Sequence, residues 1–142
     1  MSESNLDLVR QAMRAFSRRD LPALEAICHS DIELDWSRRL LDPQVIHGLD
    51  GLRRFFEDID GIFEEVIFEE EEITDFGQEV LFVSTGRFRG RMSGAQVKAR
   101  GANIWTIRDG KLARFCFYQA KEDALEDLAK ARQAAIDSGR KA

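Results

Sequence analysis

The sequence predicts an α+β domain, with three N-terminal helices packed against a cone-shaped, curved and mostly antiparallel sheet and one further helix at the C-terminus. Two observations carry this prediction. Apolar residues recur at helical spacing as far as Phe63, and the chain then becomes rich in β-branched and aromatic residues divided by short turn sequences. The 142 residues, 44% apolar and 33% charged, suit a single domain spanning residues 1–142 with its own core.

The first half of the chain contains the three predicted helices. One begins at Leu6, where apolar residues recur every three or four positions and Ser4 or Asn5 is available as the cap. Pro22 fits the first turn of a second, short helix, because its missing N–H costs nothing there. The third helix begins around Gly48 and has the clearest apolar stripe: Leu52, Phe55, Phe56, Ile59 and Phe63.

The strands and the last helix follow from alternation and turn sequences. Residues 31–36 alternate polar and apolar, which predicts a short half-buried strand, and a loop is expected from Ser37 to His47. A final charged helix is expected from Lys121 to about Ile136. Four longer strands are expected in between: Val66–Ile73, Val80–Arg91, Gln96–Arg108 and Lys111–Gln119.

The composition excludes several classes of protein. There are 26 acidic against 21 basic residues, a net charge of −5, which argues against nucleic acid as the main partner. No run approaches the roughly 18 apolar residues of a membrane span, and the N-terminus lacks the apolar stretch of a signal peptide. Cys28 and Cys116 form no disulfide or metal pattern, and His29 and His47 are the only histidines. We therefore expect a cytoplasmic protein with no metal, no cofactor and no membrane partner.

Two turns decide which side chains face the helices. A two-residue turn at Ser93-Gly94 would place Phe82 and Phe88 on one face with Asn103 and Trp105, and a set of basic residues on the other. This register sends the apolar set inward, so we adopt it.

The last hairpin allows two registers. A two-residue Asp-Gly turn would put Arg114, Cys116 and Tyr118 inside with Trp105. A three-residue loop ending in a bulge at Gly110 would instead put a more apolar set inside, and we choose it for that reason. The inward set is then Phe115, Phe117 and Gln119.

Several segments together resemble the SnoaL-like group of the nuclear transport factor 2-like superfamily, which includes ketosteroid isomerases and polyketide cyclases. The resemblance runs from about residue 6 to 128, and its best pieces are Glu33-Leu34-Asp35-Trp36-Ser37, His47-Gly48-Leu49-Asp50-Gly51 and Arg108-Asp109-Gly110-Lys111. It implies a cone-shaped fold around a small-molecule cavity. The superfold hosts enzymes, binding proteins and scaffolds, so it does not fix a reaction.

The resemblance makes Asp35 the first catalytic candidate, since isomerase-like relatives carry their proton-shuttling carboxylate on this strand. A carboxylate in the cavity beside Trp36 would have a raised pKa and could act as a general base. The alternative is that Asp35 points outward or pairs with Arg38 or Arg39.

Two further residues are catalytic candidates. Asn103 falls where the isomerases place a protonated carboxylic acid as an oxyanion donor, and its amide could donate a weaker hydrogen bond. Asn103 is otherwise an ordinary cavity-lining amide. His47 at the start of the third helix is either an acid–base residue near the cavity mouth or a cap or surface residue. The tyrosine of the isomerases' first helix falls near Ala12 here, and Tyr118, the only tyrosine, is expected to face outward.

An apolar cavity with few polar groups is typical of a small-molecule site. We expect a small apolar or carbonyl-containing ligand. The protein either binds this ligand without chemistry or converts it by cofactor-free proton transfer, cyclisation or dehydration. A third possibility is a module that serves only for dimerisation. Apolar Ile104, Cys116 and Tyr118 on the outer sheet face predict a homodimer through that face. The expected ligand-binding residues are Trp36, Phe55, Phe82, Phe88, Trp105, Phe115, Phe117 and Gln119.

Overall fold

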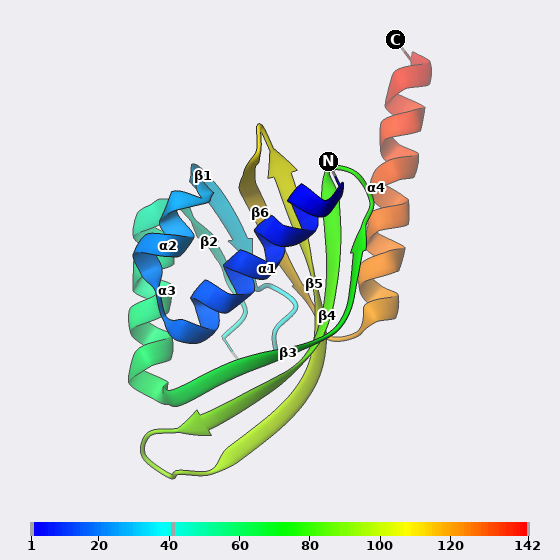
Figure 1. Cartoon of the computed structure of the whole chain (residues 1–142). Coiled ribbons are helices and arrows are strands. Elements are labelled where there is room, and N and C mark those ends of the chain that lie inside the picture. The colour runs from blue at the N-terminus through cyan, green and yellow to red at the C-terminus, as the bar shows by residue number, and fades with distance from the viewer. Residues whose placement is uncertain (1, 41, 142) are drawn as a thin grey trace.

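A computed structural model describes residues 2–40 and 42–141 and contains the predicted layers of helices and strands (Figure 1). The helices are α1 (Ser2–Arg18), α2 (Leu21–Ala26), α3 (Gly48–Ile62) and α4 (Lys121–Lys141). The strands are β1 (Cys28–Asp35), β2 (Val45–His47), β3 (Phe63–Asp75), β4 (Glu79–Gly90), β5 (Gln96–Arg108) and β6 (Lys111–Tyr118). The predicted α+β fold is confirmed, although β2 lies within the segment expected to be a loop.

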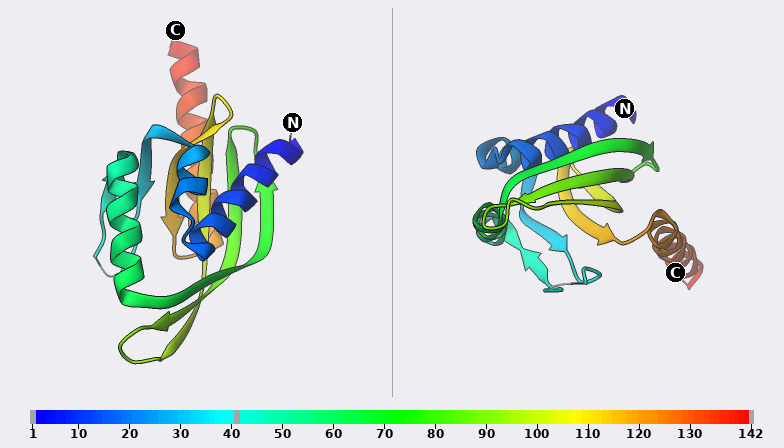
Figure 2. Two further views of the ribbon diagram at one scale, coloured as in Figure 1. Left: turned by 60° about the vertical axis from the view of Figure 1, so that its left-hand side comes forward. Right: turned by 90° about the horizontal axis from the view of Figure 1, so that it is seen from below.

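The strands form one sheet in the order β2-β1-β6-β5-β4-β3. All neighbouring pairs are antiparallel except β1 and β6, which run parallel. The long strands bend, and α1, α2 and α3 lie on one side of the sheet while α4 lies on the other (Figure 2). This arrangement gives the sheet an inner face toward α1–α3 and an outer face toward α4.

The three N-terminal helices pack with the faces that the sequence predicts, although α1 begins at Ser2 rather than at Leu6, so that Ser4 and Asn5 lie within the helix and do not cap it. In α1 the apolar stripe turns inward, and Val9 and Met13 are buried. Asp20 caps α2 by accepting a hydrogen bond from the backbone N–H of Ala23 (3.2 Å), and a proline occupies the first turn. Leu52 and Phe55 are buried on the inner side of α3. The helices therefore close the inner face with apolar side chains.

The β4–β5 hairpin keeps the predicted faces through a different turn. Arg89 pairs with Gln96, and the backbone N–H of Gly90 donates to the carbonyl of Ala95 (3.1 Å), so residues 91–94 form a four-residue loop rather than a two-residue turn. The register is shifted by two residues from the predicted one, and a shift of two leaves every side chain on the same face. Phe88 and Asn103 therefore still face inward.

The β5–β6 hairpin also reaches the predicted faces by another route. Arg108 pairs with Lys111 across a two-residue turn, in which Asp109 and Gly110 both have positive φ (53° and 75°). The expected three-residue loop is therefore wrong. An irregularity between Thr106 and Ile107 shifts the pairing by one residue, so Phe115 lies opposite Trp105. This bulge replaces the one expected at Gly110 and turns Phe117 and Gln119 inward.

The start of α4 covers an apolar patch on the outer face. Ala124 and Leu128 pack on Ile104, Cys116 and Tyr118, which are between 0% and 5% exposed. The apolar residues that motivated the homodimer prediction are thus buried within the chain by its own helix. The homodimer stays a prediction that has lost this support.

Candidate functional site

A cavity of about 290 Å³ lies between the inner face of the sheet and helices α1 and α3. Its volume is at the lower end of the range of small-molecule pockets. Apolar side chains make almost all of its wall. The lining residues are Met13, Phe16, Leu24, Leu34, Trp36, Arg39, Leu52, Phe55, Ile59, Phe63, Val66, Phe68, Ser84, Gly86, Phe88, Ala99, Arg100, Gly101, Ala102, Asn103, Trp105, Phe115, Phe117 and Gln119.

One end of the cavity is built from stacked aromatic rings. Trp36 lies against Phe55 and Phe117 in stacked arrangements, with ring centroids 4.9 and 5.6 Å apart. Phe115 lies between the two tryptophans, 4.7 Å from Trp36 and 4.9 Å from Trp105. Each such pair adds about 0.5–1.5 kcal/mol beyond its buried area, so ring contacts stabilise this end of the cavity in addition to burial.

Three polar atoms of the lining residues are buried without a hydrogen-bond partner. They are the indole Nε1 of Trp36, the indole Nε1 of Trp105 and the amide Oδ1 of Asn103. Leaving such a group unsatisfied costs about 1–3 kcal/mol, so most buried polar groups in proteins are paired. A ligand or bound water with both donor and acceptor groups would satisfy them.

Formal charge in the lining comes from two arginines at its edge. Arg39 lies 5.4 Å above the Trp36 ring and pairs with Asp42, and Arg100 pairs with Glu71 at 2.6 Å. Gln119 is also exposed and donates through Nε2 to the carbonyl of Arg38 (2.9 Å). Among the described lining residues there is no carboxylate, imidazole, thiol or phenol.

The structure places seven of the eight expected ligand-binding residues in the wall of this cavity. Phe82 is the exception: it is 2% exposed in the hydrophobic core and reaches a separate groove beside α1. Further along the same strand, Ser84, Gly86 and Phe88 line the cavity, whereas Phe82 packs in the core.

Asp35 lies on the outer face, so its predicted place in the cavity is wrong. Successive side chains of a strand point to opposite sides, and Leu34 and Trp36 both line the cavity. In the parallel pairing of β1 with β6, Asp35 lies next to Cys116, whose side chain faces α4. The carboxylate therefore lies on the far side of the sheet from the apolar wall.

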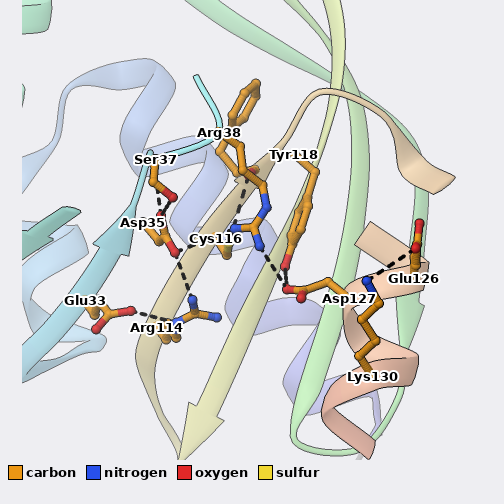
Figure 3. Close-up of polar contacts among 11 residues, drawn as sticks. Glu33, Asp35, Ser37, Arg38, Arg114, Cys116, Tyr118, Glu126, Asp127 and Lys130 are labelled. Atoms are coloured by element: carbon orange, nitrogen blue, oxygen red, sulfur yellow. Dashed lines mark hydrogen bonds and ion pairs between the residues drawn. The ribbon is translucent and has the colours of Figure 1, made fainter. Parts of the chain in front are cut away.

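Asp35 belongs to a cluster of paired charges (Figure 3). Its Oδ1 accepts from the backbone N–H and the hydroxyl of Ser37, at 2.9 and 2.5 Å. Its Oδ2 lies 3.0 Å from Arg114 Nη2 and 3.7 Å from Arg38 Nη1. Arg114 also binds Glu33 at 2.8 Å. The structure therefore agrees with the alternative expectation for Asp35, an outward side chain paired with Arg38, and adds Arg114 as a second partner.

These contacts reverse the expected pKa shift of Asp35. Burial raises the pKa of this carboxyl, but the two hydrogen bonds from Ser37 and the charges of Arg114 and Arg38 outweigh it. The pKa of Asp35 consequently lies below its ordinary value, and the group is a weak base at neutral pH. A general base needs the opposite shift.

Arg38 ties the outer cluster to α4. Its guanidinium lies 4.6 Å above the Tyr118 ring and 3.5 Å from Asp127 on α4 (Figure 3). Tyr118 donates its hydroxyl hydrogen bond to the same Asp127. Burial, and then the bond to Asp127, raise the pKa of Tyr118. The single tyrosine thus stabilises the outer face and is remote from the cavity.

Asn103 and His47, the other catalytic candidates, occupy different environments. Asn103 is 6% exposed and lines the cavity, as expected. His47 precedes α3, is exposed, makes no side-chain capping bond and does not line the cavity. The structure brings Asn103 together with the aromatic wall and leaves Asp35 and His47 outside it.

Sequence reasoning missed the part of the wall that the helices and β3 supply. Met13 and Phe16 of α1, Ile59 of α3, and Phe63 and Phe68 of β3 all line the cavity. The apolar stripes of the first and third predicted helices include all of these residues except Phe68, but periodicity alone does not show whether an inward side chain fills the core or borders a cavity.

The described residues contain neither a candidate metal site nor a candidate membrane-spanning helix. In residues 2–40 and 42–141 no group of three or more histidine, cysteine or acidic side chains could hold a metal ion. No helix in this part of the chain is long and apolar enough to cross a membrane.

The fold recurs in solved structures of low sequence identity. An NTF2-like protein of unknown function from Burkholderia pseudomallei matches with a TM-score of 0.71 and 19% identity, covering 87% of this chain and 95% of the other. TerC, crystallised with polyporic acid, matches with a TM-score of 0.73 and 18% identity over 87% and 96% of the two chains. A proposed SnoaL-like polyketide cyclase from Jannaschia sp. CCS1 matches at 0.73 and 13%, over 87% and 90%.

Sequence comparison identifies the family. No curated protein matches the chain. The model of the SnoaL-like domain family matches residues 9–115, which include most of α1, all of α2 and α3, the first five strands and most of the cavity wall. The chain therefore belongs to the SnoaL-like domain family.

Proposed function

We propose that this protein binds a small, largely apolar molecule in the cavity of its SnoaL-like domain. The observation that carries the proposal is the wall itself, which combines many aromatic rings with three unpartnered polar atoms, on Trp36, Asn103 and Trp105. Apolar walls with a few convergent polar groups are typical of ligand sites. A bound ligand would give these three atoms the hydrogen-bond partners that they lack within the protein.

The character of the wall indicates the ligand. Flat rings at Trp36, Phe115 and Trp105 favour a planar, ring-containing compound. The two indole N–H groups require an acceptor oxygen or nitrogen, and the amide oxygen of Asn103 requires a donor. A ring compound with a carbonyl and a hydroxyl group meets these requirements.

Binding is favoured over proton transfer because the cavity lacks a base. The carboxylate that the resemblance assigned to this task, Asp35, is on the outer face and in salt bridges. Asn103 can donate a hydrogen bond but cannot take up a proton at neutral pH. Of the functions expected from the sequence, the non-catalytic binding protein is the one that fits these positions.

The proposal is tested with an uncharged fluorescent probe, N-phenyl-1-naphthylamine, and a plugged cavity. Ala99 is exposed, lines the cavity and pairs with Gly86, which the rings of Phe88 and Phe68 cover. A tryptophan at this position adds an indole to a wall that is already lined by rings, and so reduces the space left for a ligand. We expect Ala99→Trp to weaken probe binding by about tenfold or more, since an occupied site excludes the probe. Polyporic acid, the compound with which TerC was crystallised, is the second ligand to titrate.

The matched control is Lys98→Trp. Lys98 is the neighbouring exposed residue of β5 and points to the opposite face of the sheet. It should leave probe affinity within about twofold of the unsubstituted protein. The proposal fails if the Ala99→Trp and Lys98→Trp variants weaken probe binding equally. It also fails if the unsubstituted protein does not bind the probe. Urea unfolding of both variants excludes loss of the fold as the cause.

A further inference from the structure

A second hollow, an open groove between α1 and β3, adjoins the cavity. Its floor is apolar and includes Phe82, the one expected ligand-binding residue that does not line the cavity. Its rim carries three arginines of α1. The groove is lined by Arg10, Met13, Arg14, Ser17, Arg18, Ile67, Phe68, Glu70 and Phe82.

The groove and the cavity share a wall. Met13 of α1 and Phe68 of β3 line both spaces. These two side chains contribute to both linings and so separate the groove from the cavity at this point. Methionine has three rotatable side-chain bonds and adapts its shape at little cost. A ligand longer than the cavity can therefore extend past Met13 into the groove.

The charges of the rim are unbalanced. Arg10 is neutralised by Glu70, whose oxygens lie 2.9 and 3.1 Å from its Nε and Nη2. Arg14 and Arg18 are exposed and make no ion pair or hydrogen bond within the described part of the chain. They lie four residues apart, on one side of α1, where like charges repel each other.

Most arginines in the described part of the chain are paired with a carboxylate. Elsewhere on the sheet, Arg87 pairs with Glu69 at 2.8 Å and Arg100 with Glu71 at 2.6 Å. The chain has five more acidic than basic residues, so carboxylates are plentiful. Two adjacent guanidiniums without a carboxylate beside an apolar floor make a site that attracts an anion.

We propose that the ligand is an amphipathic anion, whose apolar body occupies the cavity and whose carboxylate, sulfonate or phosphate group lies at Arg14 and Arg18. This inference rests on the proposed function and adds a charge and an orientation to the ligand. The head group reaches the rim past Met13 and is held there by charge-assisted hydrogen bonds to the guanidiniums.

The experiment compares two probes that differ in one charged group. 1-Anilinonaphthalene-8-sulfonate has the ring system of N-phenyl-1-naphthylamine plus a sulfonate. In the double variant Arg14→Gln/Arg18→Gln we expect the affinity for the sulfonate to fall about tenfold, and that for the neutral probe to change less than twofold. The wild-type affinity for the sulfonate, with one site per chain, should also fall with salt.

The control removes the same charge elsewhere. Lys98→Gln/Arg54→Gln replaces two exposed basic residues that line neither space and leaves the net charge equal to that of the test variant. It should weaken sulfonate binding less than twofold. Methanesulfonate, an anion without an apolar body, should compete only at concentrations far above those of the aromatic sulfonate.

Four results would overturn the inference. They are an equal loss for both probes in the test variant, an equal loss in the control, efficient competition by methanesulfonate, and displacement of the sulfonate by an acidic peptide such as polyglutamate. The first two show that the arginines do not hold the head group, and the last two show an anion site independent of the cavity. The neutral probe separates these results from failure of the proposed function, since that failure abolishes its binding to every variant.

Discussion

The two faces of the β1–β6 pair show how one stretch of sequence makes two different environments. Toward the helices, Phe115 and Phe117 form an aromatic wall with Trp36. Toward α4, the intervening Cys116 lies beside a network of salt bridges centred on Asp35. Neighbouring residues of one strand thus belong to a cavity with unpaired polar atoms and to a surface in which the charges are paired.

The difference teaches that the face of a strand decides the chemistry of a carboxylate. On the inner face, burial without partners would raise the pKa of Asp35 and make it a base. On the outer face, Ser37 and two arginines lower it. The same residue is therefore a catalytic candidate in one register and a structural salt-bridge partner in the other.

The largest expected effect comes from breaking the aromatic wall. Phe115 is 5% exposed and contacts both tryptophans, so Phe115→Ala should lower the free energy of unfolding by about 3–5 kcal/mol, measured by urea denaturation. The adjacent Cys116→Ala, on the outer face, removes a single sulfur atom and should cost about 1 kcal/mol. Equal losses would mean that the two faces do not differ in packing as described.

The next effect tests whether α4 is held to the outer face by its first turns alone. Leu128 is 7% exposed against Ile104 and Tyr118, so Leu128→Ala should cost about 2 kcal/mol. Leu125, which is 37% exposed, is the control and should cost less than about 1 kcal/mol when replaced by alanine. Amide hydrogen exchange should show fast exchange in residues 129–139, which are exposed on the projecting end of the helix.

Most of the fold was predictable because it depends on periodicity. The stripe of α3 and the alternation of the long strands indicate their class of structure directly. The two turns were not predictable, since the four-residue loop at 91–94 and the bulge before Ile107 are settled by the pairing of whole strands. Both errors left the faces unchanged, because burial of the apolar set determines the face and the turn adapts to it.

The site was predictable in its wall and not in its chemistry. The inward aromatic residues of β5 and β6 follow from alternation, as Trp105 and Phe115 show. Asp35 was assigned by resemblance, although its neighbours Leu34 and Trp36 are both inward and require it to point outward. The rim at Arg14 and Arg18 needs the distance between α1 and β3, which no local pattern contains.

A smaller effect tests the separation of the faces directly. Asp35→Asn removes the charge that binds Arg114 and Arg38, and should lower the free energy of unfolding by about 1–2 kcal/mol. Because the carboxylate lies outside the cavity, affinity for N-phenyl-1-naphthylamine should stay within twofold. Asn103→Leu is the comparison on the inner face. It removes the amide oxygen that would accept from a ligand, so it should lower the affinity for a hydroxyl-bearing ligand such as polyporic acid and leave the salt bridges intact.

The smallest effect is the pH dependence that Asp35 contributes. Its pKa in the folded protein lies below the ordinary value of 3.8, so the unfolded chain binds this proton more readily than the folded chain does. The contribution of Asp35 to stability is therefore fully present above about pH 4 to 5, and is lost as the pH falls through 3.8 toward the lower folded pKa.

We expect urea unfolding between pH 6 and pH 3 to show a steeper loss of stability in the unsubstituted protein than in Asp35→Asn. The difference between the two proteins should shrink as the pH falls, because protonation removes from the first what substitution has removed from the second. A constant difference across this range would show that the Asp35 carboxylate gains nothing from its arginines, and a difference that grows on acidification would place Asp35 in an apolar surround on the inner face after all.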